Sequence, residues 1–102
     1  MIADSDVQVW LETVQSSPPS IVVPYVQSDH NLALHYRVRV VQEGHNGKSV
    51  IGQAGAVNVL PNTPTALSQF RISRQPESRC EIEITLTGSH IQPENHRFEC
   101  PS

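Results

Sequence analysis

Residues 32–41 alternate between large apolar side chains and small or polar ones, and this pattern constrains the fold more than any other feature of the chain. A β-strand points successive side chains to opposite faces, so one face of this segment is apolar while the other carries His35, Arg37 and Arg39. The pair Asn46-Gly47 follows, which is typical of a two-residue type I′ hairpin turn. We therefore expect a strand over 32–41 that returns antiparallel over 49–60.

Five further β-like segments lie between turn residues, at 7–14, 20–27, 66–73, 80–86 and 95–100. Pro24 cannot donate a ladder hydrogen bond, which predicts an edge or a bulge for its strand. The apolar period slips between Leu67 and Phe70, which indicates a bulge or a late strand start. Together these segments predict an all-β, seven-stranded immunoglobulin-like antiparallel β-sandwich. Trp10 lies on the first strand, not between the cysteines as in antibody domains, so the likeness is one of architecture.

The length of 102 residues predicts a single domain over 1–102, with a flexible N-terminus at 1–6. The longest apolar run, 21–23, is far short of the roughly 18 residues of a membrane span. A pI near 5.9 and five aromatic residues argue against nucleic acid as a partner. No signal-peptide pattern follows Met1, so we expect either a cytosolic protein or a mature segment without its targeting sequence.

The two cysteines, Cys80 and Cys100, lie at equal distances from His90. Opposed residues in an antiparallel hairpin have a constant sum, so a turn near His90 makes the cysteines face each other. A disulfide there closes a loop of about 20 residues and contributes roughly 3 kcal/mol. A catalytic dithiol usually has the spacing Cys-x-x-Cys beside a helix, which this chain lacks. A structural disulfide in an oxidising compartment is therefore favoured over a redox site.

Patterns for catalysis and cofactors are missing from the sequence. It contains no Gly-x-Ser-x-Gly, no glycine-rich phosphate loop and no acid pair positioned for general acid–base work. The histidines lack the tight spacing of metal ligands: His30, His35, His45, His90 and His96. We expect no enzymatic activity, no metal and no cofactor.

Charge is unevenly distributed along the chain. Residues 37–74 hold five basic side chains against Glu43 alone, although the whole chain has a net charge of −3. If the 46–47 turn fixes the register, Arg37 faces Ala56 and Arg39 faces Ala54, so small neighbours leave both guanidinium groups accessible. This basic surface could steer an acidic partner. Alternatively, Glu81 and Glu83 lie across the same sheet and neutralise the arginines.

Several short motifs resemble the CsgC/CsgH-like curli assembly proteins, and the CsgH branch in particular. They span most of 7–101: Leu-x-Tyr-x-Val-x-Val at 34–40, Gly47-Lys48-Ser49, Gln53-x-Gly55-x-Val57, Leu67-Ser68, and Cys80-x-Ile82 with Phe98-x-Cys100-Pro101. The CsgC branch has a Cys-x-Cys pair, whereas these cysteines are twenty residues apart. The resemblance therefore carries no redox role to this chain.

The resemblance implies a periplasmic chaperone-like protein that binds acidic, aggregation-prone curli-type amyloid subunits and inhibits premature fibril nucleation. Its binding surface would be Arg37 and Arg39, with His35 and Lys48 at the periphery. We expect a monomer that binds no nucleic acid or membrane. One alternative is a non-catalytic immunoglobulin-like adhesion or structural module of a secreted or surface protein. Another is a small periplasmic redox or metal-binding domain.

Overall fold

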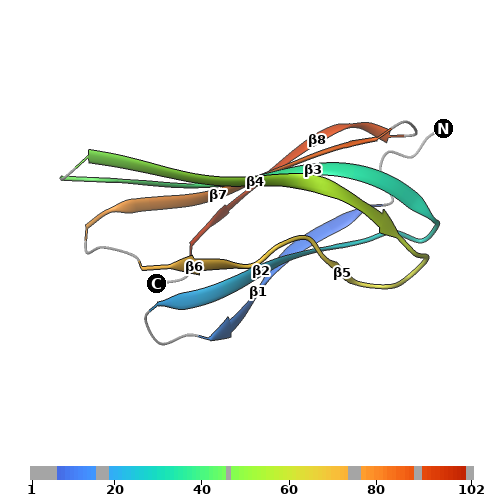
Figure 1. Ribbon diagram of the computed structural model, residues 1–102, viewed down its shortest axis with the longest axis horizontal. Helices are drawn as coiled ribbons and strands as arrows, with labels where there is room; N and C mark the ends of the chain where they lie inside the picture. The colour runs from blue at the N-terminus through green and yellow to red at the C-terminus, as the bar shows by residue number, and fades with distance from the viewer. Residues whose placement is uncertain (1–6, 16–18, 46, 74–76, 89–90, 101–102) are drawn as a thin grey trace.

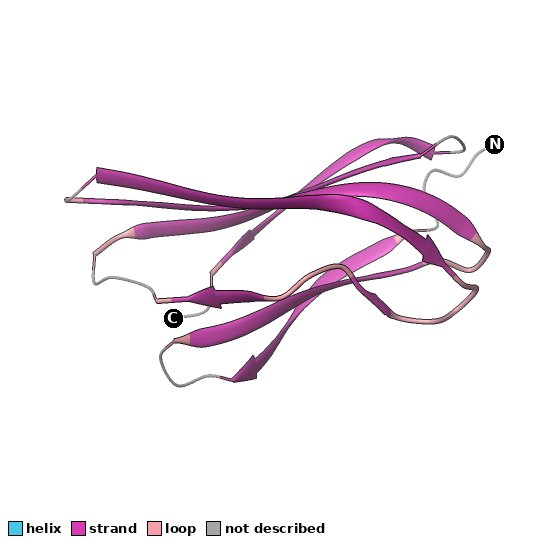
Figure 2. Cartoon of the chain, viewed as in Figure 1, coloured by secondary structure: helices cyan, strands magenta, loops and turns pink. Residues whose placement is uncertain are grey.

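The computed structural model describes residues 7–15, 19–45, 47–73, 77–88 and 91–100, and these residues form eight β-strands. The strands are β1 (Gln8–Gln15), β2 (Ser20–Gln27), β3 (Leu32–Gly44), β4 (Gly47–Val59), β5 (Thr65–Ala66), β6 (Phe70–Ile72), β7 (Arg79–Gly88) and β8 (Ile91–Glu99). Strand structure dominates the chain from one end of the molecule to the other (Figure 2). None of the described residues belongs to a helix long and apolar enough to cross a membrane.

The strands form two antiparallel sheets that lie face to face (Figure 1). In the first sheet β1 pairs with β2, and the short strands β5 and β6 pair with the other side of β2. The second sheet has the order β4-β3-β7-β8. The fold is therefore all-β and sandwich-like, as the alternation of side chains predicts.

The core lies between the two sheets, because every second side chain of a strand points toward the other sheet and these side chains are apolar. In β3 and β7 the even-numbered side chains are the buried ones, and β2 contributes Val22 and Val26 from the other sheet. The largest fully buried side chains of the second sheet are Leu34, Val38, Val59, Ile82, Ile84 and Leu86. This parity sends the odd-numbered residues of β3 and β7 to the outer face, where the candidate site lies.

The predicted number of strands is wrong by one. Segment 66–73 is not one strand but two, because its backbone leaves β2 after Ala66 and rejoins it at Phe70. The slip in the apolar period between Leu67 and Phe70 is the sequence signature of this interruption. Strand β8 also starts four residues earlier than predicted, at Ile91 instead of Asn95. The immunoglobulin-like topology stays a prediction.

Pro24 lies in β2, the central strand of its sheet, and not at an edge. The strand tolerates it because β6 pairs with residues 20–22 and β5 pairs with residues 25–26, leaving position 24 outside both ladders on that side. The carbonyl of Pro24 is still used, since it accepts a hydrogen bond from the Leu67 amide at 2.9 Å. Three expectations lie outside the described residues: the flexible segment 1–6, the conformation of Asn46 and the turn at His90.

Candidate functional site

The outer face of the β4-β3-β7-β8 sheet carries the basic side chains that the alternation predicts. His35, Arg37 and Arg39 follow one another at every second position of β3, and all three are exposed. Consecutive outward positions on a strand are about 7 Å apart, so the three form a row along the sheet. We call these three residues, together with Arg97 of β8, the outer basic surface.

The register between β3 and β4 differs from the expected one by two residues. The pairing ends at Gly44 and Gly47, so Arg37 lies opposite Ala54 and Arg39 lies opposite Gly52. The expected partners were Ala56 and Ala54. A shift of two residues keeps every side chain on its predicted face, whereas a shift of one would have inverted the strand. The arginines therefore still face small residues.

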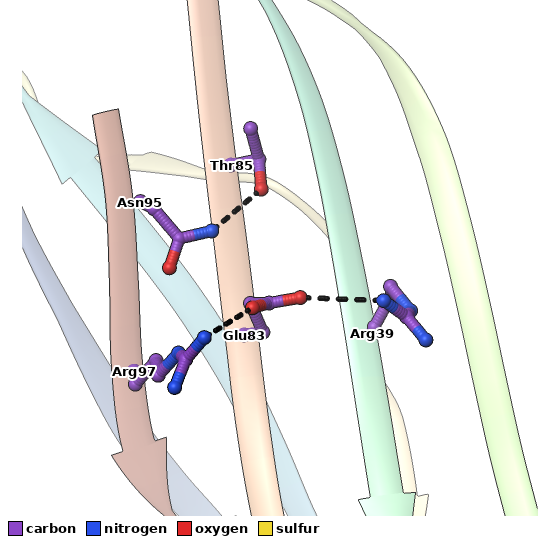
Figure 3. A network of polar contacts seen from close by, with 5 residues as sticks. All are labelled: Arg39, Glu83, Thr85, Asn95 and Arg97. Carbon is purple, nitrogen blue, oxygen red and sulfur yellow. Dashed lines mark hydrogen bonds and ion pairs between the residues drawn. The ribbon is translucent and has the colours of Figure 1, made fainter. Parts of the chain in front are cut away.

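Arg39 is partly neutralised by an acidic residue of the neighbouring strand. Its Nη1 lies 3.5 Å from Oε1 of Glu83, which is its direct partner on β7. Arg97 of β8 approaches the other carboxylate oxygen of Glu83, with Nη2 at 3.4 Å from Oε2. One carboxylate thus joins two arginines across three strands (Figure 3). The alternative expectation, that glutamates across the sheet offset the charge of the arginines, is therefore correct for Arg39 and Glu83.

Arg37 has a different environment from Arg39. Its neighbours across the sheet are Ala54 on β4 and Thr85 on β7, neither of which carries charge. Within the ranges that the structure describes, Arg37 forms no ion pair. It also lines an open hollow on the outer face, together with His35, Tyr36, Ala54, Gly55, Thr85 and Thr87. Of the two arginines on β3, Arg37 is therefore the better placed to meet an anionic partner.

The two peripheral candidates lie at opposite ends of the surface. His35 lies beside the hollow, opposite Ala56 on β4 and Thr87 on β7. Lys48 lies near the tip of the β3–β4 hairpin, opposite Glu43, and is separated from Arg39 by the row that contains Val41 and Val50. The structure thus groups His35 with the arginines and places Lys48 apart from them.

Arg97 was missed at the level of sequence, although a signal for it was present. The constant sum that pairs Cys80 with Cys100 also pairs Glu83 with Arg97, and the observed register has this pairing. The same rule pairs Thr85 with Asn95, whose side-chain amide donates to the Thr85 hydroxyl at 3.1 Å (Figure 3). The outer face is therefore held by side-chain contacts between β7 and β8.

The predicted disulfide is confirmed. Cys80 and Cys100 are bonded, with a Cα–Cα distance of 5.4 Å, and both are buried. The Cys100 amide also donates to the Cys80 carbonyl at 3.1 Å. The bridge therefore fastens the end of the chain to β7, beside the charged rows of the outer face.

Acidic residues border the basic surface on the side of the disulfide. Glu81 lies directly opposite Glu99, one outward row beyond Glu83 and Arg97. Among the described residues, no group of three or more histidine, cysteine, aspartate or glutamate side chains could hold a metal ion. The arrangement offers charged side chains on an open sheet and a hollow between them, which suits contact with a charged macromolecule.

These features define a class: small, disulfide-bonded, all-β proteins with two stacked sheets and a charged outer face. The family of the thin aggregative fimbriae synthesis protein, Tafi-CsgC, matches residues 1–92. The chain therefore belongs to this family of CsgC/CsgH-like curli assembly proteins.

Known relatives agree with this assignment. The curli assembly proteins CsgC of Escherichia coli K12 and of Escherichia coli O1:K1 are each 22% identical over 87 residues, which cover 85% of this chain and 79% of the relative. The structure of E. coli CsgC matches with a TM-score of 0.77 and 20% identity, over 90% of this chain and 97% of that one. The solution structure of R. palustris CsgH matches with a TM-score of 0.72 and 17% identity, over 91% of both chains. These likenesses show a shared fold, and the special likeness to the CsgH branch stays a prediction.

Proposed function

We propose that this protein binds curli-type amyloid subunits in the periplasm and delays their fibril nucleation, acting as a monomer and without catalysis. The observation that carries the proposal is Arg37, an exposed guanidinium group whose direct partners on both neighbouring strands, Ala54 and Thr85, are uncharged. The curli assembly role of the family supports the choice of client.

The physical basis is electrostatic steering of an acidic, aggregation-prone chain. Charged groups of opposite sign raise the rate of encounter between proteins more than they raise the affinity of the complex. Brief contacts of this kind would occupy subunits while their strands are still unpaired, which is the stage at which edge-to-edge association begins. Because exposed charges are screened over about 10 Å at 0.1 M salt, the delay should shorten as salt is added.

An amyloid assembly assay with purified curli subunits tests the proposal. Wild-type protein at substoichiometric concentration should lengthen the lag phase, and Arg37→Glu should remove most of that effect. Arg71→Glu is the matched control, because it makes the same change of charge at an exposed position of β6, in the other sheet.

Two results would contradict the proposal. One is equal inhibition by Arg37→Glu and wild type at low salt. The other is a stable complex with the subunit that leaves the lag phase unchanged, a result that would favour an adhesion or structural module.

A further inference from the structure

Strand β4 is an exposed sheet edge that lacks the usual protection. It runs for 13 residues and pairs only with β3 among the described strands. It contains no proline, and Lys48, next to its first residue, is its one charged side chain. A long edge strand with unpaired N–H and C=O groups is a template on which another strand can pair.

The other edges of the two sheets carry features that oppose such pairing. Strand β8 contains Pro93, followed by the charged Glu94, and its register with β7 shifts beyond Leu86. Strand β1 has a register shift between Thr13 and Gln15. Strands β5 and β6 are only two and three residues long. Short strands, prolines, charges and bulges are the devices by which proteins protect their edges, so the unprotected state of β4 is a local exception.

The register identifies the backbone groups of β4 that point to the free edge. The bond from the Cys100 amide to the Cys80 carbonyl shows that even-numbered residues of β7 bond toward β8. Bonding direction alternates from one residue to the next along an antiparallel strand, so the odd-numbered residues of β7 bond to their odd-numbered partners on β3. The even-numbered residues of β3 therefore bond to β4, where their partners are odd-numbered. The outward backbone groups therefore belong to the even-numbered residues of β4, and those in the middle of the strand are Val50, Gly52, Ala54 and Ala56.

These same residues leave space between the free edge and the outer basic surface. Ala56, Ala54 and Gly52 lie opposite His35, Arg37 and Arg39, respectively. A strand added to β4 would lie two strand spacings, about 10 Å, from β3. Only small side chains would separate its outward residues from the arginines, whose long side chains can bridge that distance.

The tip of the hairpin adds an apolar contact region to this edge. Val50 and Ile51 are 49% and 48% exposed, and they point to opposite faces of β4. The hairpin of β3 and β4 extends past the ends of the strands of the first sheet, so no described strand of that sheet lies beneath this tip (Figure 1). An added strand with alternating side chains could place an apolar residue beside either one.

We propose that β4 binds an extended, acidic segment of an amyloid subunit by adding it as a fifth strand to the β4-β3-β7-β8 sheet. The proposal deepens the proposed function and rests on it, since it names the binding mode of the same surface. Charge complementarity selects the occupant: acidic side chains would approach the outer basic surface. A second copy of this chain would instead bring a second Lys48 and a second row of arginines toward the first, which is unfavourable.

Ala54→Pro tests this mode without changing any charge. Proline removes the outward N–H at the centre of the edge, while the bonds to β3 come from odd-numbered residues and remain. Ala54→Ser is the matched control, because it keeps both the N–H and a small side chain at the same position. We expect Ala54→Pro to lose most of the lag extension in the curli assembly assay, and Ala54→Ser to retain it. Equal inhibition by both variants, or equal loss in both, would overturn the proposal.

Amide hydrogen exchange of the wild-type protein provides a second test that needs no variant. The probe is a synthetic peptide of alternating acidic and β-branched residues, with a lysine-substituted version as its control. The acidic peptide should slow amide exchange at Val50, Gly52, Ala54 and Ala56 by at least about tenfold, and the lysine-substituted peptide should leave it unchanged. Unchanged exchange there would overturn the binding mode, as would slowing that depends on protein concentration without peptide, because β4 would then pair with a second copy.

The two tests separate this proposal from the proposed function. If Arg37→Glu abolishes inhibition while Ala54→Pro inhibits like wild type, the function stands and the edge mode is wrong. If the acidic peptide protects the β4 edge but wild-type protein leaves the curli lag phase unchanged, the edge binds extended strands and the client is wrong.

Discussion

The Arg39 guanidinium lies 3.5 Å from the Glu83 carboxylate, and this pair separates two arginines that the sequence treats as equivalent. The Arg39 side chain keeps 45% of its exposure and the Glu83 side chain 20%, so the contact lies on the open face of the sheet. Because Arg97 contacts the same carboxylate, Glu83 offsets part of the charge of each arginine. Arg37, two residues along β3, lies opposite Thr85 and Ala54 instead, so no carboxylate lies directly opposite it.

The first prediction concerns the cost of reversing each charge. Arg37→Glu should change the free energy of unfolding by no more than about 0.5 kcal/mol, because its neighbours are uncharged and exposed surface positions tolerate substitution. Arg39→Glu should cost up to about 1 kcal/mol, because it places two carboxylates directly opposite each other. Urea unfolding of the two variants measures the difference. Equal stability losses would show that Glu83 does not distinguish the two positions.

The second prediction concerns Glu83→Gln, which should strengthen inhibition of amyloid nucleation. The substitution frees Arg39 and Arg97 from a shared partner, and exposed ion pairs are worth at most about 1 kcal/mol, so the fold should persist. Glu81→Gln is the matched control, since it changes the net charge equally at a position opposite Val41 and Glu99. Lag times in the curli assembly assay provide the measurement. Equal lengthening by both variants would mean that total charge, and not the released arginines, governs the effect.

The sequence could predict which face each side chain occupies, because an error of two residues in the strand register leaves odd- and even-numbered residues on the same faces. Arg37 and Arg39 reach the outer face in either the expected or the observed pairing, since the two differ by an even number of residues. The disulfide was predictable for a related reason: Cys80 and Cys100 are placed symmetrically in a hairpin, so a single constant sum fixes their pairing.

The neighbours of the arginines were not predictable in the same way. Whether Glu83 lies beside Arg39 depends on which strand is next to β3 and on the register between them, and no turn connects β3 directly to β7. The division of 66–73 into β5 and β6 likewise depends on where β2 offers free backbone groups. Local alternation indicates an interruption between Leu67 and Phe70, but it contains no information on which strand lies beside β3 or on the strand with which β5 and β6 pair.

The third prediction is that reducing the disulfide lowers the free energy of unfolding by about 3 kcal/mol, the value expected for a loop of this length. The sequence separation of the two cysteines is 20, and opening the bridge restores conformational freedom mainly to the unfolded chain. Urea unfolding with and without reductant measures the loss, and alkylation followed by mass measurement confirms the redox state. Two reactive thiols in the native, non-reduced protein would contradict the disulfide itself.

The last prediction concerns the close approach of the Tyr36 side chain on β3 to Gly55, its direct partner on β4. A Cβ atom at Gly55 would lie 2.9 Å from the Tyr36 hydroxyl oxygen and 3.1 Å from the adjoining ring carbon. Overpacking typically costs about 1–3 kcal/mol, so Gly55→Ala should destabilise the protein, toward the lower end of that range because the Tyr36 hydroxyl is the far end of a half-buried side chain. Gly52→Ala is the control on the same strand, because its Cβ would be no closer than 3.6 Å to any neighbouring atom and should cause little loss.

A double-mutant cycle can separate this steric effect from a general cost of substituting glycine. Tyr36→Phe removes the hydroxyl that is nearest to the new Cβ, so it should recover part of the stability lost in Gly55→Ala. It should recover nothing in Gly52→Ala, whose Cβ would instead lie near the Val38 carbonyl. Additive effects of Gly55→Ala and Tyr36→Phe would show that the tyrosine does not require glycine at this position. Coupling between them would show that the Tyr36 side chain requires a glycine at position 55, one residue from Ala54, the partner of Arg37.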